Sequence, residues 1–270
     1  MIRVLLLLLV LPFIGCVNDS DSGENGDENG DENGNIHTLE QIAVYPLQVN
    51  DPSGLTIDAS GDFLWTVSDD SGDHIYKMSF TGDILDVLPY EGDDMEGITM
   101  NPNDHTLWVA EERLRQIVQL DTLGQVLQVV NIDVDETNPN DGLEGIAIHP
   151  VTEHLFVLNE KNPRLFIELN RNFQIVREVP VNFSPPYNMT DVAGLWYDHP
   201  ENLFWIVSDE SEKIVITDFD LNPLHYYELD HDKFEGIAVD RQHEKIYLVN
   251  DRQNRLYVFA LPDDPVSANR

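Results

Sequence analysis

The sequence predicts an all-β protein, a five-bladed β-propeller of four-stranded blades in which the N-terminal strand completes the last blade. Two observations predict this fold. A glycine followed by a short apolar run recurs at intervals of 43, 48, 49 and 42 residues, at Gly54, Gly97, Gly145, Gly194 and Gly236. An acidic residue follows each glycine by 14 or 15 positions, at the end of a second apolar run. Repeats of this period, built from short β-rich runs, are typical of propeller blades.

Each repeat reads as four short strands separated by turns. The first strand begins at the glycine, as in "GIAI", and the third follows the acidic position. A turn near Gly82, Gly124, Asn172 or Asn222 leads to the fourth strand. The second strand always carries a large aromatic side chain, which we expect to pack in the core between blades: Trp65, Trp108, Phe156, Trp205 and Tyr247.

The two ends of the repeat array predict how the ring closes. The fifth repeat ends after "RLYVFALPDDP" without a fourth strand, whereas an apolar run without a repeat of its own, "QIAVYPLQV" at 41–49, precedes the first glycine. This run can supply the missing strand, which leaves the propeller without an open edge. We therefore place the propeller at residues 37–264 and a short C-terminal tail at 265–270.

The N-terminus predicts export and lipid anchoring. The segment "MIRVLLLLLVLPFIGC" has the charge and apolar length of a secretory signal and is too short for a spanning helix. "FIGC" resembles the lipobox of bacterial lipoproteins, so residues 1–16 are expected to be a signal peptide ending at a lipidated Cys16. The alternative is a plain signal peptide with an unmodified cysteine. Cys16 is the only cysteine, which excludes an intrachain disulfide.

Residues 17–36 are rich in Asp, Glu, Asn and Gly and predict an acidic, disordered linker. We expect a lipid-anchored location in the cell envelope. Because Val17 rather than aspartate follows the cysteine, this would be the periplasmic side of the outer membrane in a Gram-negative cell. The formal net charge of −35 excludes nucleic acid as a partner and favours cations.

The repeat geometry brings two sets of residues to one mouth of the central channel. Strand one of a blade lines the channel and strand two runs antiparallel to it, so the start of the first and the end of the second share a face. The residue before the glycine is glutamate in three repeats and Ser53 or Ala193 in the other two, so the fold itself does not demand a carboxylate. Three converging glutamates without matching bases repel one another unless a cation binds. The predicted metal ligands are Glu96, Glu144 and Glu235.

The acids that end the second strands are further candidates for metal or rim ligands: Asp69, Glu111, Glu160, Asp209 and Asp251. Since an acid occupies this position in all five repeats, the alternative is that these carboxylates cap the backbone N–H groups of the next turn. Carboxylate and carbonyl oxygens, with no cysteine or histidine at matching positions, favour Ca²⁺ over Mg²⁺ and argue against zinc or copper.

The lipoprotein-like N-terminus, the five repeats and the motifs "MEGITM", "LEGIAIHP" and "FEGIAVD" resemble the SdiA-regulated family of bacterial envelope proteins over residues 38–262, and more distantly the NHL-like and phytase-like propellers. The resemblance implies a five-bladed propeller with a calcium site and implies no particular activity. It extends to Glu96, Glu144 and Glu235, whereas Ser53 and Ala193 depart from the motif.

Three functions are compatible with these features, because propellers host binding, catalysis and scaffolding. The first is a monomeric calcium-binding lipoprotein that recognises an unknown small molecule or envelope protein at its acidic channel mouth. The second is a calcium-dependent hydrolase of an ester, lactone or phosphoester, with catalytic residues unassigned and no G-x-S-x-G motif for covalent catalysis. The third is a scaffold with a purely structural calcium. The nearest bases either rim the mouth or pair with neighbouring acids: Arg113, Arg115, Lys161, Arg164 and Arg252.

Overall fold

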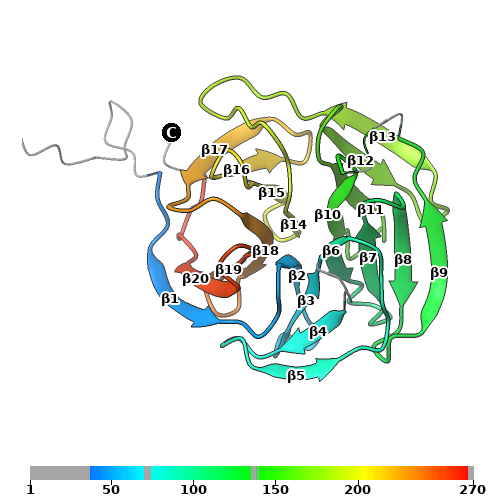
Figure 1. The fold of residues 1–270 in the computed structure, drawn as a ribbon. Helices are drawn as coiled ribbons and strands as arrows, with labels where there is room; N and C mark the ends of the chain where they lie inside the picture. The colour runs from blue at the N-terminus through cyan, green and yellow to red at the C-terminus, as the bar shows by residue number, and fades with distance from the viewer. Residues whose placement is uncertain (1–36, 70–73, 135–137, 139, 267–270) are drawn as a thin grey trace, which may run out of the picture.

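The protein forms a ring of five antiparallel sheets around a central axis (Figure 1). The computed structural model describes residues 37–69, 74–134, 138 and 140–266. Cys16 and the linker at 17–36 therefore lie outside the described residues, as do the last four residues of the chain. Each sheet has four strands, so the structure is the five-bladed propeller that the repeat predicts. Within the described ranges no helix is long and apolar enough to cross a bilayer.

The strands follow the chain blade by blade, from the channel outward. Blade 1 holds β2 (Pro52–Ile57), β3 (Leu64–Ser68), β4 (Ile75–Met78) and β5 (Ile84–Val87), and blade 2 holds β6 (Met95–Met100), β7 (Leu107–Glu111), β8 (Gln116–Leu120) and β9 (Val126–Asn131). Blade 3 holds β10 (Leu143–Ile148), β11 (Leu155–Asn159), β12 (Leu165–Leu169) and β13 (Ile175–Pro180), and blade 4 holds β14 (Leu195–Asp198), β15 (Leu203–Ser208), β16 (Lys213–Asp218) and β17 (Pro223–Glu228). Blade 5 combines β18 (Phe234–Asp240), β19 (Lys245–Asn250) and β20 (Arg255–Ala260) with β1 (Gln41–Pro46).

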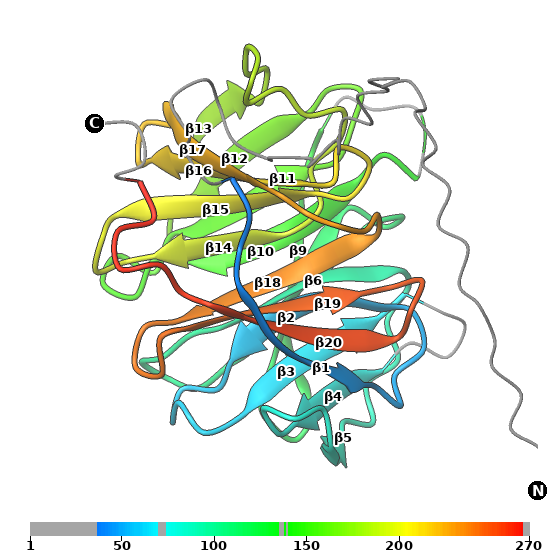
Figure 2. The ribbon, with the colours of Figure 1, turned by 90° about the vertical axis from the view of Figure 1, so that its left-hand side faces the viewer.

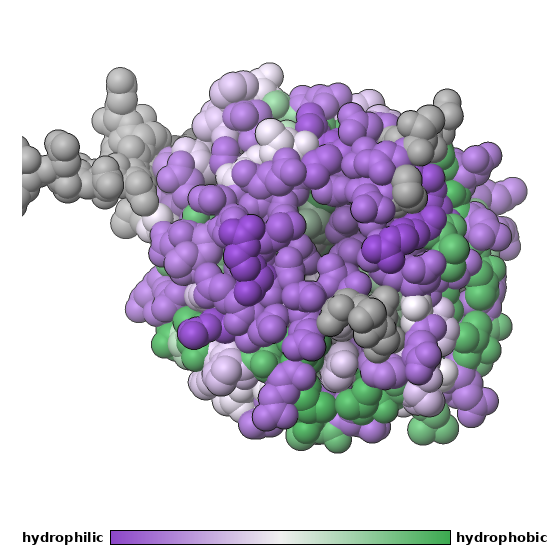
Figure 3. Space-filling view, in the orientation of Figure 1, coloured by the Kyte–Doolittle hydropathy of each residue, from purple (hydrophilic) through white to green (hydrophobic). Residues whose placement is uncertain are grey.

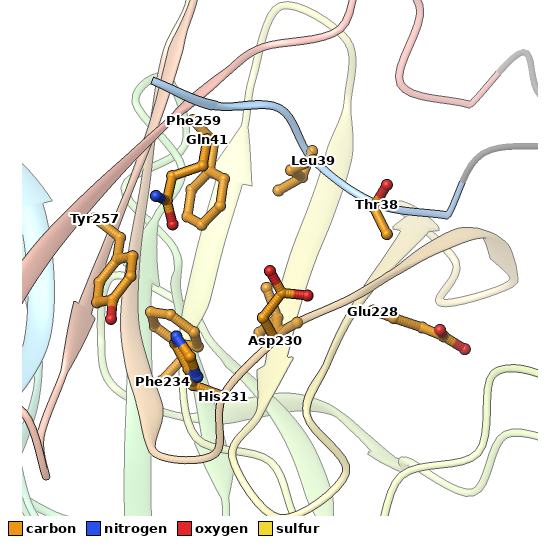
Figure 4. Close-up of a pocket in the computed structure, with 10 residues that line it drawn as sticks. Thr38, Leu39, Gln41, Glu228, Asp230, His231, Phe234, Tyr257 and Phe259 are labelled. Atoms are coloured by element: carbon orange, nitrogen blue, oxygen red, sulfur yellow. The ribbon is translucent and has the colours of Figure 1, made fainter. Parts of the chain in front are cut away.

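The first strand of the chain closes the ring, as predicted. β1 runs antiparallel to β20, with Val44 opposite Tyr257 and Tyr45 opposite Leu256 (Figure 2). A cavity of about 20 Å³ lies between the segment before β1, the loop before β18, and β20 (Figure 4). That volume holds about one water molecule, so this cavity is not a ligand site.

The hydrophobic core lies between the blades. The inner strands are buried along most of their length, whereas the outermost strands β5, β9 and β13 are largely exposed. The aromatic residues of the second strands are buried, which confirms their predicted place in the core: Trp65, Trp108, Phe156, Trp205 and Tyr247.

The repeated glycines allow the five inner strands to touch one another around the axis. A Cβ atom on Gly194 would lie 2.0 Å from the carbonyl oxygen of Glu235, and one on Gly97 would lie 2.3 Å from that of Glu144. Each glycine meets the backbone of the next blade in the same way. Only about 10 Å³ of space remains at this level, within a ring of buried Leu and Ile side chains: Leu55, Ile98, Ile146, Leu195 and Ile237. The channel is therefore closed at its middle, with a separate cavity at each end.

Candidate functional site

A backbone irregularity accompanies the residue before the glycine in four of the five blades. In blades 1, 2, 3 and 5 the pairing between the first and second strands shifts register at this point. An irregularity of this kind re-aims a side chain without ending the strand. Glu96, Glu144 and Glu235 all line one cavity at the channel mouth, and Ala193 lines it in blade 4. In blade 1, the Ser53 hydroxyl donates a hydrogen bond to Glu96 Oε2 at 2.7 Å.

The residue fifteen positions after each glycine also reaches this cavity. Asp69, Glu160, Asp209 and Asp251 line it, as the sequence predicts. In blade 2 the lining residue is Glu112 and not the predicted Glu111. Glu111 is the last residue of β7 and is buried against Tyr90, whose hydroxyl donates to Glu111 Oε1 at 2.5 Å. The spacing of fifteen is then constant in all five blades, so an exact count from Gly97 would have found Glu112.

In blades 3, 4 and 5 the residue before the acidic position makes hydrogen bonds to the turn after the second strand or to the loop beside it. The Asn159 side chain donates to the carbonyl oxygens of Asp141, Lys161 and Pro163. Ser208 Oγ accepts from the N–H of Ser211, and Asn250 Oδ1 accepts from that of Gln253. In these three blades turn capping, the alternative role of the acidic set, thus falls on the preceding residue. The acids that follow are placed at the cavity.

The cavity has a volume of about 160 Å³ and a lining dominated by acids. Hydrophilic side chains surround the central hollow on this face (Figure 3). Among the described residues, its lining comprises nine carboxylates, one lysine, one asparagine and one alanine: Asp69, Glu96, Glu112, Glu144, Glu160, Asp191, Asp209, Glu235, Asp251, Lys233, Asn140 and Ala193. Its volume equals that of about five water molecules, which suits an ion with a few bound oxygens.

Burial and mutual repulsion hold the three glutamates toward their protonated forms. The pKa of Glu96 lies well above its ordinary value because the carboxyl is buried and faces Glu235 and Asp69. Burial, with Glu96 and Glu160 nearby, likewise raises the pKa of Glu144 well above the ordinary range. Burial and Asp251 raise that of Glu235, against a smaller opposing effect of Lys233. A divalent cation would compete with these protons and stabilise the ionised carboxylates.

Three other acids of the mouth have pKa values raised to between about 6 and 8. Burial and a hydrogen bond with Asp94 raise the pKa of Glu112 to about 8. Burial and a hydrogen bond with Asp209 raise the pKa of Asp191 to about 7. Burial and Asp51 raise the pKa of Asp251 to about 6.

One basic residue in the mouth escaped the sequence reasoning. Lys233 Nζ lies 2.5 Å from Asp209 Oδ2 and 3.6 Å from Glu235 Oε1. Burial raises the pKa of Asp209, but its hydrogen bonds with Asp191 and Lys233 outweigh that effect and lower it below the ordinary value. One base therefore accompanies the three glutamates, because Lys233 lies next to Glu235 on the blade 5 side of the mouth. The sequence signal was its place two residues before Glu235, in "DKFEG".

The five basic residues that the sequence places near the mouth contact neighbouring acids or backbone oxygens instead of lining the cavity. Arg113 forms ion pairs with Asp93 and Asp94, and Lys161 pairs with Glu160 and Glu210. Arg252 forms an ion pair with Asp232. Arg164 donates to the carbonyl oxygen of Thr190, and Arg115 donates to that of Asn138. None of these five lines the cavity.

The donor set fits a hard divalent cation. Among the described residues, four groups of three acids place their ligand atoms within 4.8 Å of one another. Two of these groups consist only of residues that line the cavity: Asp69, Glu96 and Glu235, and Glu112, Glu144 and Glu160. Two buried oxygens, Asp209 Oδ1 and Glu235 Oε2, have no hydrogen-bond partner among the described residues. An all-oxygen set with unsatisfied buried carboxylates is what Ca²⁺ prefers, with Mg²⁺ second.

Similar folds occur in solved structures of distant sequence. The glutaminyl cyclase of Myxococcus xanthus superimposes with a TM-score of 0.64 at 11% identity, over 83% of this chain and 98% of that one. A chain in a nidogen–laminin complex superimposes with a TM-score of 0.56 at 15% identity, over 78% of this chain and 76% of that one. At these identities the likeness concerns the fold alone. A family model matches residues 35–260, nearly the whole propeller, and the chain belongs to the SdiA-regulated family.

Proposed function

We propose that this protein is a calcium-binding propeller lipoprotein of the bacterial cell envelope, which binds a ligand or partner at its acidic channel mouth. The observation that carries the proposal is the pair of buried carboxylate oxygens without partners, Asp209 Oδ1 and Glu235 Oε2, in a cavity lined by nine acids of the described chain. Unpaired buried acceptors cost free energy that a bound cation would recover.

The cation would be held by the glutamates that precede the glycines, with the acids of the second-strand ends as further ligands. The bound ion would supply positive charge that orients oxygen-bearing groups at the mouth. One divalent ion and Lys233 together still leave acids in excess. A partner at this face is therefore more favourably neutral or cationic than anionic, unless it coordinates the ion directly.

Thermal melting of a soluble form spanning residues 36–270, in EDTA and in Ca²⁺, tests the metal site. Calcium at about 100 times its Kd should add about 2.7 kcal/mol, or roughly 5–10 °C for a domain of this size. Glu96→Gln and Glu144→Gln should remove most of this shift. Glu178→Gln, the same change on the exposed strand β13, should retain it. No shift at about 10 mM Ca²⁺, well above the weak limit of extracellular calcium modules, would refute the site.

The anchor is tested separately, in cells. We propose that Cys16 carries lipid, so the wild-type protein should incorporate labelled fatty acid and sediment with membranes. Cys16→Ser should abolish both without changing the melting temperature of the domain. A wild-type protein that remains unlabelled and unbound to membranes would contradict the anchor and leave the calcium site unaffected.

A calcium-dependent hydrolase is a second candidate, favoured by one observation. The pKa values of Asp251, Asp191 and Glu112 lie at about 6, 7 and 8. Groups that titrate near neutral pH in one cavity suit general acid–base catalysis. A screen of esters, lactones and phosphoesters in Ca²⁺ should then find turnover that Glu112→Gln reduces and Glu178→Gln preserves. A screen without turnover would leave binding as the function.

A further inference from the structure

The cavity at the opposite end of the channel has a different chemistry from the acidic mouth. It has a volume of about 380 Å³ and is lined by the ends of the first strands of all five blades and the turns that follow. The closed ring of Leu and Ile side chains at the channel centre separates it from the mouth. Its volume equals that of about a dozen water molecules and falls in the range of small-molecule pockets.

The wall of this cavity is largely apolar. It includes five large side chains and three prolines: Ile57, Met100, Ile148, Trp196, Val239, Pro102, Pro150 and Pro200. Apolar walls of this kind give binding energy in proportion to the ligand area that they cover.

The charged groups in the wall are already paired within the protein. Arg241 Nε lies 2.8 Å from Asp198 Oδ1, and its Nη2 lies 2.5 Å from Asp198 Oδ2, a two-point ion pair with a buried aspartate. Asp58 Oδ2 accepts a hydrogen bond from Trp65 Nε1 at 2.9 Å and faces Lys77 Nζ at 3.4 Å. A charged ligand would have to break one of these pairs to gain a partner, so charge complementarity selects an uncharged ligand.

One position of the repeat departs from the pattern in this cavity. Two residues after the glycine, four blades carry small side chains: Thr56, Thr99, Ala147 and Ala238. Blade 4 carries Trp196, which is only partly buried although it packs against two core clusters. The repeat therefore accepts a large residue at this position, and three of the small ones, Thr56, Thr99 and Ala147, line the cavity together with the Trp196 indole. A partly exposed indole beside an apolar hollow is a surface that a flat ring can cover.

We propose that this second cavity binds a small, uncharged, predominantly apolar molecule with an aromatic ring that packs on Trp196. This inference does not depend on the calcium site, because the two cavities share no lining residue. The same chain would then carry two independent sites, one for a cation and one for a neutral ring compound.

The neutral fluorophore N-phenyl-1-naphthylamine is a suitable probe, titrated into residues 36–270 in EDTA. Excitation of tryptophan should give energy transfer to one bound probe per chain, with saturation. Gln242→Trp, at an exposed position on the cavity rim, should weaken binding at least tenfold without lowering the melting temperature appreciably. Trp196→Ala should weaken binding similarly.

Three controls separate this cavity from other sites. Gln128→Trp, the same change on the exposed outer strand β9, should leave probe affinity unchanged. Leu127→Ser removes an exposed apolar side chain from that strand and should also leave it unchanged. Glu144→Gln in the mouth should not alter it either. Non-saturating binding, or equal affinity in wild type, Gln242→Trp and Trp196→Ala, would overturn the proposal, as would loss of binding in Leu127→Ser alone.

Discussion

Glu144 faces only acidic groups among the charges that shift its pKa, in contrast to Glu235, which lies near Lys233. In the metal-free protein at pH 8 its ionisation is opposed both by burial and by its neighbours. Glu144→Gln keeps the shape and removes the charge. We therefore expect a higher melting temperature than wild type in EDTA, by about 2–4 °C for each kcal/mol gained.

In saturating Ca²⁺ the wild type should instead have the higher melting temperature, because Glu144→Gln lacks a carboxylate that the ion would use as a ligand. Melting of both proteins in EDTA and in saturating Ca²⁺ checks the crossing, with Glu178→Gln as the matched change on an exposed strand. A variant that is less stable than wild type in EDTA would show that Glu144 serves the fold as a hydrogen-bonding group and not as a ligand.

The shifted acids also predict how the metal-free protein responds to pH. In the unfolded chain a carboxyl has a pKa of about 4, whereas burial and acidic partners raise the folded values of Glu112 and Asp191 to about 8 and 7. The folded state thus holds more protons, and stability falls as pH rises through this range. His225 acts in the opposite sense, because burial lowers its pKa to about 4. Its effect is confined to pH below about 6.5.

Between pH 6.5 and 8.5 the acids therefore act alone. The melting temperature in EDTA should fall steadily across this interval, and saturating calcium should flatten the slope, since the ion then displaces the protons. Glu112→Gln should reduce the slope in EDTA. A melting temperature that stays level or rises with pH in EDTA would contradict the raised pKa values.

At the scale of strands, the glycine in each first strand matters more for the ring than for its own blade. Gly194→Ala would place a Cβ atom 2.0 Å from the carbonyl oxygen of Glu235, a backbone atom that cannot move without shifting β18. We expect a loss of about 3 kcal/mol or more, measured by urea unfolding. Ala193→Ser, one residue earlier and at the cavity, should be nearly neutral. Equal stability of the two variants would show that adjoining blades can separate at the axis.

The strand pattern was predictable from the sequence because every blade packs against its neighbours with the same types of residue at the same positions. Glycine at the axis, an aromatic residue between sheets and an acid at the second turn recur with nearly constant spacing. Individual side chains were less predictable. Glu111 and Glu112 are adjacent acids, and the residue type alone does not show which one reaches the mouth; the constant spacing of fifteen from the glycine selects Glu112. Lys233 has no counterpart in the other repeats, so no repeated pattern could reveal it.

At the scale of the whole molecule, each end of the channel results from residues that are far apart in the chain. The acidic mouth could be anticipated because its residues repeat. The apolar cavity could not, because it depends on the small side chains of Thr56, Thr99 and Ala147 beside the large one of Trp196, and on where the channel closes. Its volume is a property of the ring and of no single repeat.

The closure of this ring involves β1, which belongs to the start of the chain and completes the last blade. A chain that begins at residue 48 would leave the β20 edge unpaired and uncover the side of blade 5, including Tyr257 and Phe259. Compared with a chain that begins at residue 37, we expect a melting temperature lower by roughly 10 °C or more.

Open strand edges also pair with other chains, so size-exclusion chromatography of the shortened chain should show association that increases with concentration. A peptide of residues 37–47 added in excess should restore both the monomer and the melting temperature, because it can occupy the β20 edge. If the chains that begin at residues 37 and 48 are both monomeric and have equal melting temperatures, the other nineteen strands hold the ring closed without β1.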